Sequence, residues 1–369
     1  MGCPMKSTVT MMVRPMMRRD IALGFCLGVL LYIVYFVVNN NSTWKESLYF
    51  PEQHTSDEAS HIRRNEPGFI EPLLSTDVNE APEEGKGIFF LETSPFREEG
   101  VSLTARQACA VESAARMNPT MQVYFLLLNQ SKISAKAQDF VNILLSYENI
   151  KIRQIFMKDY VKNTLLEKWW DPKILSHSGW PTHHTSDILR YLTLAKFGGI
   201  YLDLDVVVMK SLEHLTNFVG AEDWMNVASG VLGFGIDDLG RRVADACLTE
   251  LKTDFRGDMW AYNGPGVITR TLKKLCDTEH IRDMSKERCH GFTVYPPSAF
   301  YPISYPDWKL YFEAKSKNST MQTIKDSFAI HTWNKLSSAG VITVGSEVPY
   351  ALVANEFCPK IYRHSGKFF

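Results

Sequence analysis

The hydrophobic pattern of the chain begins with one long apolar run near the N-terminus. Residues 21–38, IALGFCLGVLLYIVYFVV, contain no charged side chain. As a helix this run would be about 27 Å long, which suits a thin bilayer. Arg14, Arg18 and Arg19 precede it, so the positive-inside rule places the N-terminal side in the cytosol. The pattern predicts a type II membrane protein with a cytoplasmic tail at 1–20 and a transmembrane signal anchor at 21–38.

A cleaved signal peptide is the alternative for this run. Its apolar core would usually be about 7–15 residues long and would be followed by an A-x-A-like site, and neither feature is present around Val38. Residues 39–85 come next, with few apolar positions and three Lys or Arg against ten Asp or Glu. A segment of this kind cannot bury enough surface to order itself. It predicts a stem at 39–85 and a luminal domain at 86–369.

From Gly87 onward, short apolar runs alternate with amphipathic stretches. The runs at 88–94 and 123–129 read as buried strands. The stretch at 104–116 reads as a helix with Thr104 as its N-cap. This alternation predicts an α/β domain.

The most informative strand follows a pair of glycines. A strand predicted at 200–206 places Asp203 and Asp205 on the same face, inside an otherwise apolar run. Two buried carboxylates are costly unless a cation compensates them, and oxygen ligands favour a hard divalent ion such as Mn²⁺ or Mg²⁺. Ligands of open α/β sheets collect beyond the carboxyl ends of strands, so the position suits a nucleotide diphosphate. The alternative is that the strand ends at Leu202 and both aspartates are solvated loop residues.

Two other segments carry polar side chains that a ligand could contact. Asp187 and Arg190 lie three residues apart on a helix predicted to end at Gly198, so they share one face. They could hydrogen-bond ligand hydroxyls, or form a surface ion pair with each other. Asn263 precedes a Gly-Pro-Gly turn that could present its amide to a substrate, and an ordinary Asx turn is the alternative.

Composition limits the classes of protein that remain. The 369 residues are 45% hydrophobic and 22% charged, which excludes a disordered or low-complexity chain. The formal charge of −1 shows no basic excess and argues against a nucleic acid partner. That total combines a basic tail and an acidic stem with a mildly basic body, which suits an anionic ligand.

The cysteines and glycosylation sequons fit a body that lies in an oxidising lumen. Cys276 and Cys289 could close a short loop, and at least one of the other three body cysteines is expected to stay a buried thiol. Sequons predict N-glycosylation at Asn41, Asn129 and Asn318.

The block SDILRYLTLAKFGGIYLDLD at 186–205 resembles the donor-site signature of DxD glycosyltransferases of the GT-A type, in particular the α1,4-glycosyltransferase family. The resemblance extends over most of residues 87–362. It includes FFLETS at 89–94, ACAVESAAR at 108–116, NGPGVITR at 263–270, YPPSAFYPI at 295–303, DWKLYF at 307–312 and AIHTWN at 329–334. It implies a nucleotide-sugar-binding mixed sheet flanked by helices.

The resemblance also implies roles for individual residues. Mn²⁺ or Mg²⁺ would be held at the phosphates of a UDP-sugar by Asp203, Asp205 and His331. The donor would be contacted by Asp187, Arg190, Asp203 and Asn263. The loop after Glu92 would receive the uracil. No protein base or nucleophile is implied, and Asn263 is the only side chain considered for a catalytic contact.

The activity implied is that of a retaining hexosyltransferase in the Golgi membrane. It would move galactose or N-acetylgalactosamine from a UDP-sugar to the terminal sugar of a glycolipid, in α1,4 linkage. Three alternatives remain: α1,4-N-acetylglucosaminyl transfer to glycoprotein glycans, a DxD-type metal-dependent phosphohydrolase, and an inactive glycan-binding protein. A homo-oligomer is compatible with each. Trp260, Trp308 and Trp333 would either stack on sugar rings or pack in the core.

Overall fold

The structure is a computed structural model that describes residues 70, 73, 81–130 and 132–369. The predicted tail and anchor, and the sequon at Asn41, lie outside the described residues. In the part of the chain that is described, no helix is both long and apolar enough to cross a membrane. All described residues belong to one compact unit, Glu52–Phe369.

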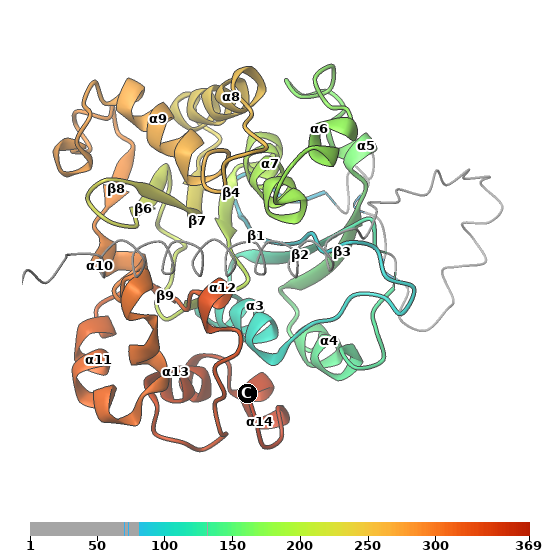
Figure 1. Cartoon of the computed structure of the whole chain (residues 1–369), viewed down its shortest axis with the longest axis vertical. Coiled ribbons are helices and arrows are strands. Elements are labelled where there is room, and N and C mark those ends of the chain that lie inside the picture. The colour runs from blue at the N-terminus through green and yellow to red at the C-terminus, as the bar shows by residue number, and fades with distance from the viewer. Residues whose placement is uncertain (1–69, 71–72, 74–80, 131) are drawn as a thin grey trace, which may run out of the picture. The chain divides into compact units, whose positions relative to one another are not determined.

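A mixed sheet of seven strands forms the centre of this unit (Figure 1). Its order is β3-β2-β1-β4-β7-β6-β8. Neighbouring strands are parallel from β3 to β4 and from β6 to β8, while β7 is antiparallel to both β4 and β6. The strands are β1 Gly87–Glu92, β2 Gln122–Leu128, β3 Ile150–Ile155, β4 Gly199–Leu202, β6 Phe218–Ala221, β7 Val227–Phe234 and β8 Thr293–Tyr295. The predicted α/β class is confirmed, and the mixed sheet has helices on both faces.

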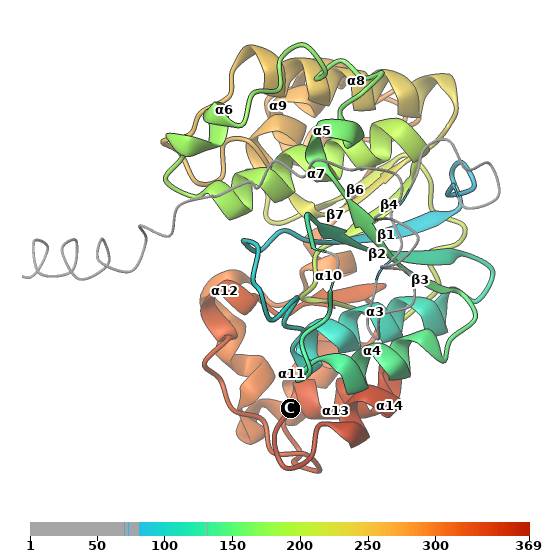
Figure 2. The same cartoon turned by 90° about the vertical axis from the view of Figure 1, so that its right-hand side faces the viewer.

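Two layers of helices cover the sheet, one on each face (Figure 2). One layer contains α5 Met157–Tyr160, α6 Lys173–Ser176, α7 Pro181–Phe197, α8 Asp238–Thr253 and α9 Pro265–Leu275. The opposite layer contains α3 Ala105–Met117, α4 Gln138–Leu145, α11 Lys317–Ile324, α13 Pro349–Phe357 and α14 Pro359–His364. The short helices are α10 Pro297–Phe300, α12 Asn334–Ser337, η1 Ile281–Asp283, η2 Tyr305–Phe312 and η3 Ala314–Ser316.

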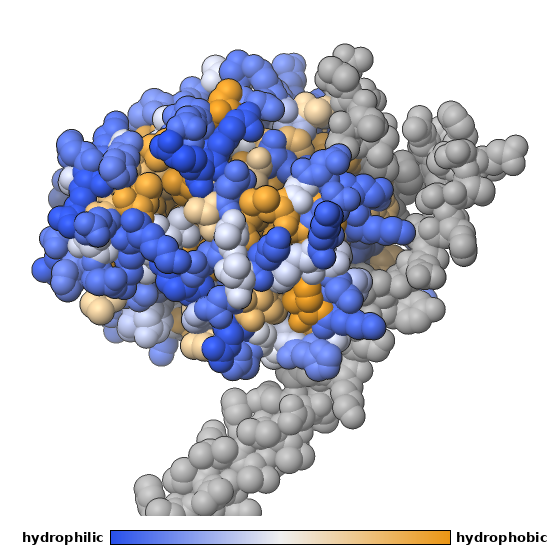
Figure 3. Space-filling model, turned by 90° about the horizontal axis from the view of Figure 1, so that it is seen from above, coloured by the Kyte–Doolittle hydropathy of each residue, from blue (hydrophilic) through white to orange (hydrophobic). Residues whose placement is uncertain are grey.

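The helices are amphipathic, as their place between sheet and solvent requires. In α8, Val243, Cys247 and Leu251 recur at four-residue spacing and are buried. Seen from above, the outer surface is mainly hydrophilic, with hydrophobic residues in small separate patches (Figure 3). The apolar side chains of α8 therefore face the interior of the unit.

The predicted helix at 104–116 is confirmed as α3. Thr104 accepts a hydrogen bond from the backbone N–H of Gln107, whose side chain accepts one from the N–H of Thr104. The helix that carries Asp187 also exists, but it begins earlier than the signature block, at Pro181. Proline suits the first turn of a helix because its missing N–H has no helical partner there. This helix ends at Phe197, and the capping residue Gly198 has φ = +63°.

The predicted strand at 200–206 is wrong in one respect. β4 ends at Leu202, and residues 203–205 form a turn in which Val206 N–H donates to the Asp203 carbonyl (3.0 Å). The chain then enters β5 Val206–Val208, which belongs to a separate two-stranded sheet with β9 Ala329–His331. Alternating hydrophobicity did not reveal this break, because Val206 to Val208 are as buried as β4 itself.

Two disulfides are present among the described residues, one between cysteines far apart in sequence and one between cysteines close in sequence. Cys276 pairs with Cys289, as predicted. Cys109 in α3 pairs with Cys358 after α13. Cys247 is a buried free thiol, which agrees with the expectation that at least one of these three cysteines stays unpaired.

Part of the segment predicted as a stem packs against the folded unit. Ile70 is buried in the core, and Leu73 N–H donates to the carbonyl of Gln154 on β3 (2.7 Å). Contacts of the compact unit therefore reach at least to residue 70.

Candidate active site

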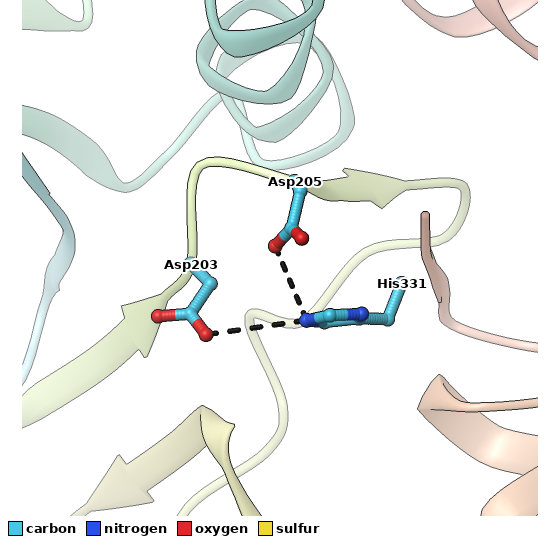
Figure 4. A group of neighbouring side chains, drawn as sticks. All are labelled: Asp203, Asp205 and His331. Carbon is cyan, nitrogen blue, oxygen red and sulfur yellow. Dashed lines mark ion pairs between the residues drawn. The ribbon is translucent and has the colours of Figure 1, made fainter. Parts of the chain in front are cut away.

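Three side chains meet at the turn that follows β4. Asp203 and Asp205 come from the turn itself, and His331 ends β9 directly opposite Val206. Figure 4 shows the imidazole turned toward both carboxylates. One ligand atom from each residue lies within 4.8 Å of the other two. The three residues predicted as metal ligands are therefore adjacent in the fold.

Each carboxylate is held by one oxygen and directs the other to this meeting point. Asp203 Oδ1 accepts the Tyr201 hydroxyl (2.6 Å), and Asp205 Oδ2 accepts the Asn334 backbone N–H (2.8 Å). The other oxygens, Asp205 Oδ1 and Asp203 Oδ2, lie 3.1 and 4.0 Å from His331 Nε2. The protein thus fixes both side chains and leaves one oxygen of each available to a ligand.

These separations fit a divalent ion. At ligand distances of about 2.1 Å, neighbouring octahedral ligands lie about 3.0 Å apart and opposite ones about 4.2 Å. The distances of 3.1 and 4.0 Å fall in that range. Two carboxylate oxygens and one imidazole nitrogen form a donor set that Mn²⁺ accepts and Mg²⁺ tolerates less well. The residues present therefore fit the metal site that the sequence predicts.

The charges of the three groups are strongly coupled. Burial opposes ionisation of Asp203, but Arg190 and His331 outweigh it and lower its pKa to about 2. Burial raises the pKa of Asp205, and the nearby Asp203 carboxylate adds to that rise. Burial alone would lower the pKa of His331, yet Asp205 and Asp203 raise it above its ordinary value. The two carboxylates thus favour positive charge at this point, which a bound cation would also supply.

Arg190 connects this cluster to α7. Its Nη1 lies 3.2 Å from Asp203 Oδ1, and its Nη2 lies 3.3 Å from Asp187 Oδ1. It also donates to the carbonyl (2.8 Å) and hydroxyl (3.0 Å) of Ser229 on β7. Burial alone would lower the pKa of Arg190, but Asp203, Tyr201 and Asp187 raise it. The guanidinium is therefore permanently charged and rigidly held.

Asp187 and Arg190 do pair, but not on the surface. Both side chains are less than a tenth exposed. Burial raises the pKa of Asp187 to about 7, although Arg190 opposes the rise. The alternative of a solvated helix-surface ion pair is therefore wrong, because this face of α7 packs against β7 and the loop before α9 rather than facing water.

Asn263 precedes Gly264, which packs against Asp187, but its own side chain has a different environment from the one expected. Its side-chain Oδ1 accepts the Arg256 N–H (2.9 Å), and its Nδ2 donates to the Arg256 carbonyl (2.7 Å). The residue is fully buried. In this structure its amide holds the loop between α8 and α9, and its contact with a donor or a reacting sugar stays a prediction.

A cavity of about 140 Å³ opens beside the carboxyl end of β1. Its lining includes Glu92, Arg97 and Gln130. The Gln130 side chain is buried, and its Oε1 has no hydrogen-bond partner among the described residues. Glu92 is held by the Ser94 N–H (2.7 Å). The loop after Glu92, predicted to receive a uracil, thus borders a polar cavity on the same edge of the sheet as Asp203.

Several site residues carried no signal in the sequence. Tyr201, Ser229 and Asn334 each hold one of the charged side chains described above. Tyr301 packs against His331 at a tilt, with ring centroids 5.4 Å apart, and its buried hydroxyl has no hydrogen-bond partner in the described part of the chain. Hydroxyls and backbone amides are too common to mark a site by spacing alone. The motif resemblance was the one available hint, since Tyr201, Asn334 and Tyr301 lie in the quoted segments 186–205, 329–334 and 295–303, whereas Ser229 lies in none.

The two predicted glycosylation sites in the described part of the chain have unlike surroundings. Asn318 is exposed on α11, whereas Asn129 is half-buried with φ = +53° at the end of β2. Neither observation tests their modification.

Two family models match the chain, and each includes part of this site. The model described as a glycosyltransferase sugar-binding region containing a DXD motif matches residues 104–224, which include Asp187, Arg190, Asp203 and Asp205. The model described as an alpha 1,4-glycosyltransferase conserved region matches residues 236–365, which include His331. The site is therefore that of a DXD glycosyltransferase.

Curated relatives identify the family. Lactosylceramide 4-alpha-galactosyltransferase of Rattus norvegicus is 32% identical over 285 residues, 75% of each chain. Alpha-1,4-N-acetylglucosaminyltransferase of Homo sapiens is 28% identical over 283 residues, 75% of this chain and 80% of that one. The chain belongs to the α1,4-glycosyltransferase family, which favours a transferase over the phosphohydrolase alternative.

A solved structure, the PaToxG glycosyltransferase, aligns with 78% of this chain and 89% of its own, at 16% identity and a TM-score of 0.38. Similarity at that score is too low to support a conclusion.

Proposed function

We propose that the protein is a metal-dependent, retaining α1,4-hexosyltransferase that uses a UDP-sugar and extends the terminal sugar of a glycolipid. The convergence of Asp203, Asp205 and His331 beyond β4 is the observation that carries the proposal. The galactosyltransferase relatives favour galactose, with N-acetylgalactosamine next, as the sugar transferred. The acetylglucosaminyltransferase relative keeps N-acetylglucosamine as the alternative donor sugar.

The metal site and the α7 pair would have distinct tasks. Asp203, Asp205 and His331 would hold Mn²⁺ or Mg²⁺, which when bound neutralises the charge that builds up on the leaving diphosphate. Arg190 fixes Asp203 and Asp187 relative to each other, so it acts as a positioning residue in this structure. Asp187 would accept hydrogen bonds from donor-sugar hydroxyls. These side chains are preorganised before any substrate arrives.

Stereochemistry defines the bond changes. The sugar of a UDP-hexose is α-linked, so an α1,4 product retains its configuration. The bond between the anomeric carbon and the diphosphate oxygen breaks, the acceptor O4 bonds to that carbon on the same face, and the O4 proton leaves with UDP. This route requires alignment and charge stabilisation more than a protein base, so we assign none.

The location in the cell is also a proposal. The apolar run at 21–38 and the arginines before it favour a type II anchor in the Golgi membrane. A stem of tens of residues would let the enzyme reach lipid headgroups, which favours a glycolipid acceptor over a soluble one.

Calorimetric titration of UDP into the full-length protein tests the metal site. With Mn²⁺ present, Asp205→Asn should weaken UDP binding about 100-fold, because even residues that only support a ligand are worth about 10–100-fold in metal affinity. Without metal the variant and the wild type should bind equally weakly. Asp326→Asn, which changes an acid whose side chain is 86% exposed, is the matched control and should bind normally. UDP affinity that is the same in Asp205→Asn and wild type would refute the metal assignment.

A panel of UDP-galactose, UDP-N-acetylgalactosamine and UDP-N-acetylglucosamine against neutral glycolipids and free oligosaccharides tests the substrate. Transfer of galactose to a glycolipid is the expected result. Transfer of N-acetylglucosamine alone would establish the alternative activity, and UDP binding without transfer from any donor would indicate an inactive glycan-binding protein.

A further inference from the structure

Of the three tryptophans considered for sugar stacking, Trp260 is the most exposed, and Trp308 and Trp333 are partly buried. Trp333 donates its indole N–H to the Ile303 carbonyl (2.8 Å) and packs on His331, with ring centroids 4.3 Å apart. Trp308 packs on Phe312 in η2. Trp260 is 36% exposed in the loop between α8 and α9.

The loop that carries Trp260 is held in place at two points. The buried Asn263 amide binds both backbone groups of Arg256, at 2.9 and 2.7 Å. Gly179 N–H, from the segment before α7, donates to the Gly257 carbonyl (2.9 Å). An exposed indole on a fixed loop loses little conformational entropy when it binds a ligand.

The surroundings of Trp260 connect it to the donor side of the site. The His183 ring lies 4.1 Å away between centroids, and Trp180 meets the indole edge-on at 5.6 Å. His183 shares one face of α7 with Asp187 and Arg190, four and seven residues further on, which is about 6 and 10 Å along the helix. The indole therefore contacts α7 about one turn before Asp187.

The C-terminal part of the chain reaches the same indole. Lys335 Nζ lies 4.9 Å from the Trp260 ring centroid. Lys335 directly follows Asn334, whose N–H holds Asp205. Lys335 is exposed, and no described carboxylate pairs with it, so it can move off the ring at small cost. Trp260 thus contacts both α7, which carries Asp187 and Arg190, and α12, whose first residue Asn334 holds Asp205.

The surface around Trp260 is apolar and is bordered by polar groups. Met259 is 43% exposed and Leu336 is 46% exposed, next to Trp260 and Lys335 respectively. Burial together with the charges of Lys335 and Arg190 lowers the pKa of His183 to about 4, so its imidazole is neutral. Such a ring both donates and accepts hydrogen bonds. The apolar indole ring, bordered by a neutral imidazole and an amine, is complementary to a neutral sugar, which has an apolar face and hydroxyl groups at its edge.

We propose that Trp260, with His183 and Lys335, forms the subsite on which the terminal sugar of the acceptor stacks, and a β-galactoside is a suitable probe for it. The proposal rests on the proposed function. In a β-galactoside, the hydrogens on C3, C4 and C5 form an apolar patch on one face, while the axial O4 points to the other face. Stacking of that patch on Trp260 leaves O4 directed away from the indole. A β-glucoside, whose O4 is equatorial, lacks this continuous patch.

Steady-state kinetics on the full-length enzyme test the subsite. Trp260→Ala should raise KM for lactose about 10-fold or more, in line with the loss of a buried tryptophan contact. KM for the UDP-sugar and calorimetric affinity for UDP with Mn²⁺ should stay within about twofold of wild type. Trp260→Phe should recover part of the loss, because it keeps an aromatic face. Trp308→Phe, at a tryptophan packed within η2, should leave both KM values unchanged.

Saturation-transfer NMR gives a readout that does not require turnover. With UDP and Mn²⁺ bound, the wild type should saturate the C3, C4 and C5 protons of methyl β-galactoside more strongly than those of methyl β-glucoside, and Trp260→Phe should reduce this difference.

The outcomes separate this inference from the proposed function. An unchanged lactose KM in a folded Trp260→Ala, in an enzyme that binds UDP and transfers hexose, would overturn the subsite and leave the function intact. If Trp260→Ala raised only the KM for the UDP-sugar, Trp260 would belong to the donor site, and the proposed acceptor subsite would be wrong. A wild type that neither binds UDP with Mn²⁺ nor transfers hexose would remove the proposed function, and this inference with it.

Discussion

At the scale of single residues, Asp187 shows how burial and charge compete. One guanidinium, that of Arg190, lies within 3.3 Å of two carboxylates, Asp187 and Asp203. Asp203 gains further hydrogen bonds and keeps its charge with a pKa of about 2, whereas burial raises the pKa of Asp187 to about 7. The two acids therefore differ in protonation at neutral pH although they share a partner.

We expect Asp187→Asn to become more stable relative to wild type as pH rises. An unfolded Asp titrates near 4, so between about pH 4 and 7 the folded wild type holds a proton that the unfolded chain has lost, and its stability falls as pH rises. Asn does not titrate. The difference in thermal stability should be small at pH 5 and reach on the order of 1–3 kcal/mol at pH 8.

The control for this experiment is Asp326→Asn, whose side chain is exposed and whose difference from wild type should not grow in this way. If Asp187→Asn were less stable than wild type at pH 8, the ion pair with Arg190 would outweigh the burial.

At the scale of elements, the junction between α7 and α9 sets the donor-side geometry. Tyr191 on α7 donates to the Gly264 carbonyl (2.6 Å), and Gly264 packs directly against the Asp187 carboxylate. A Cβ at position 264 would collide with that carboxylate. The position of α9 relative to α7 therefore depends on a residue without a side chain.

We expect Gly264→Ala to displace Asp187 and, with it, Arg190. Forcing a methyl group into a packed contact typically costs about 1–3 kcal/mol, and the displaced pair should also weaken binding of a UDP-sugar more than binding of UDP itself. Thermal unfolding and calorimetry measure the two effects. Gly179→Ala is the control, since a Cβ there would meet its nearest neighbour at 3.7 Å, an ordinary contact. Normal UDP-sugar affinity in Gly264→Ala would show that Asp187 does not touch the sugar.

At the scale of the whole folded unit, the disulfide Cys109–Cys358 joins segments 249 residues apart in sequence. It connects α3, which packs under the sheet, to the region after α13, downstream of His331. Cys276–Cys289 closes a loop of only 13 residues. The long bridge thus restrains the C-terminal segment that completes the metal site.

We expect removal of the long bridge to cost more stability than removal of the short one. Loop-closure entropy grows with loop length, so Cys109→Ser/Cys358→Ser should lose about 5–6 kcal/mol and Cys276→Ser/Cys289→Ser about 3 kcal/mol. Thermal unfolding under non-reducing conditions measures both. The long-bridge variant should also lose Mn²⁺-dependent UDP binding at a lower temperature. Equal losses in both variants would argue against the entropic account.

The sequence alone determined the kinds of local structure and the chemistry. Periodicity and capping residues located α3, β1 and β2, and the glycines located the end of α7, because these signals act over a few neighbouring residues. The acids Asp203 and Asp205 were identifiable because paired carboxylates in an apolar run are energetically unfavourable without a cation.

Only the tertiary structure decided how those residues meet. A strand and a turn between two strands of different sheets bury the same apolar side chains, so the break after Leu202 could not be read from hydrophobicity. The pairing of β5 with β9 brings His331 to Asp205 across more than 120 residues, and no local pattern encodes that distance. Asn263 and Trp260 acquired their surroundings in the same way. Contacts between distant segments depend on how the whole sheet and its helices pack. That packing is determined by all segments of the sequence together and not by any one of them.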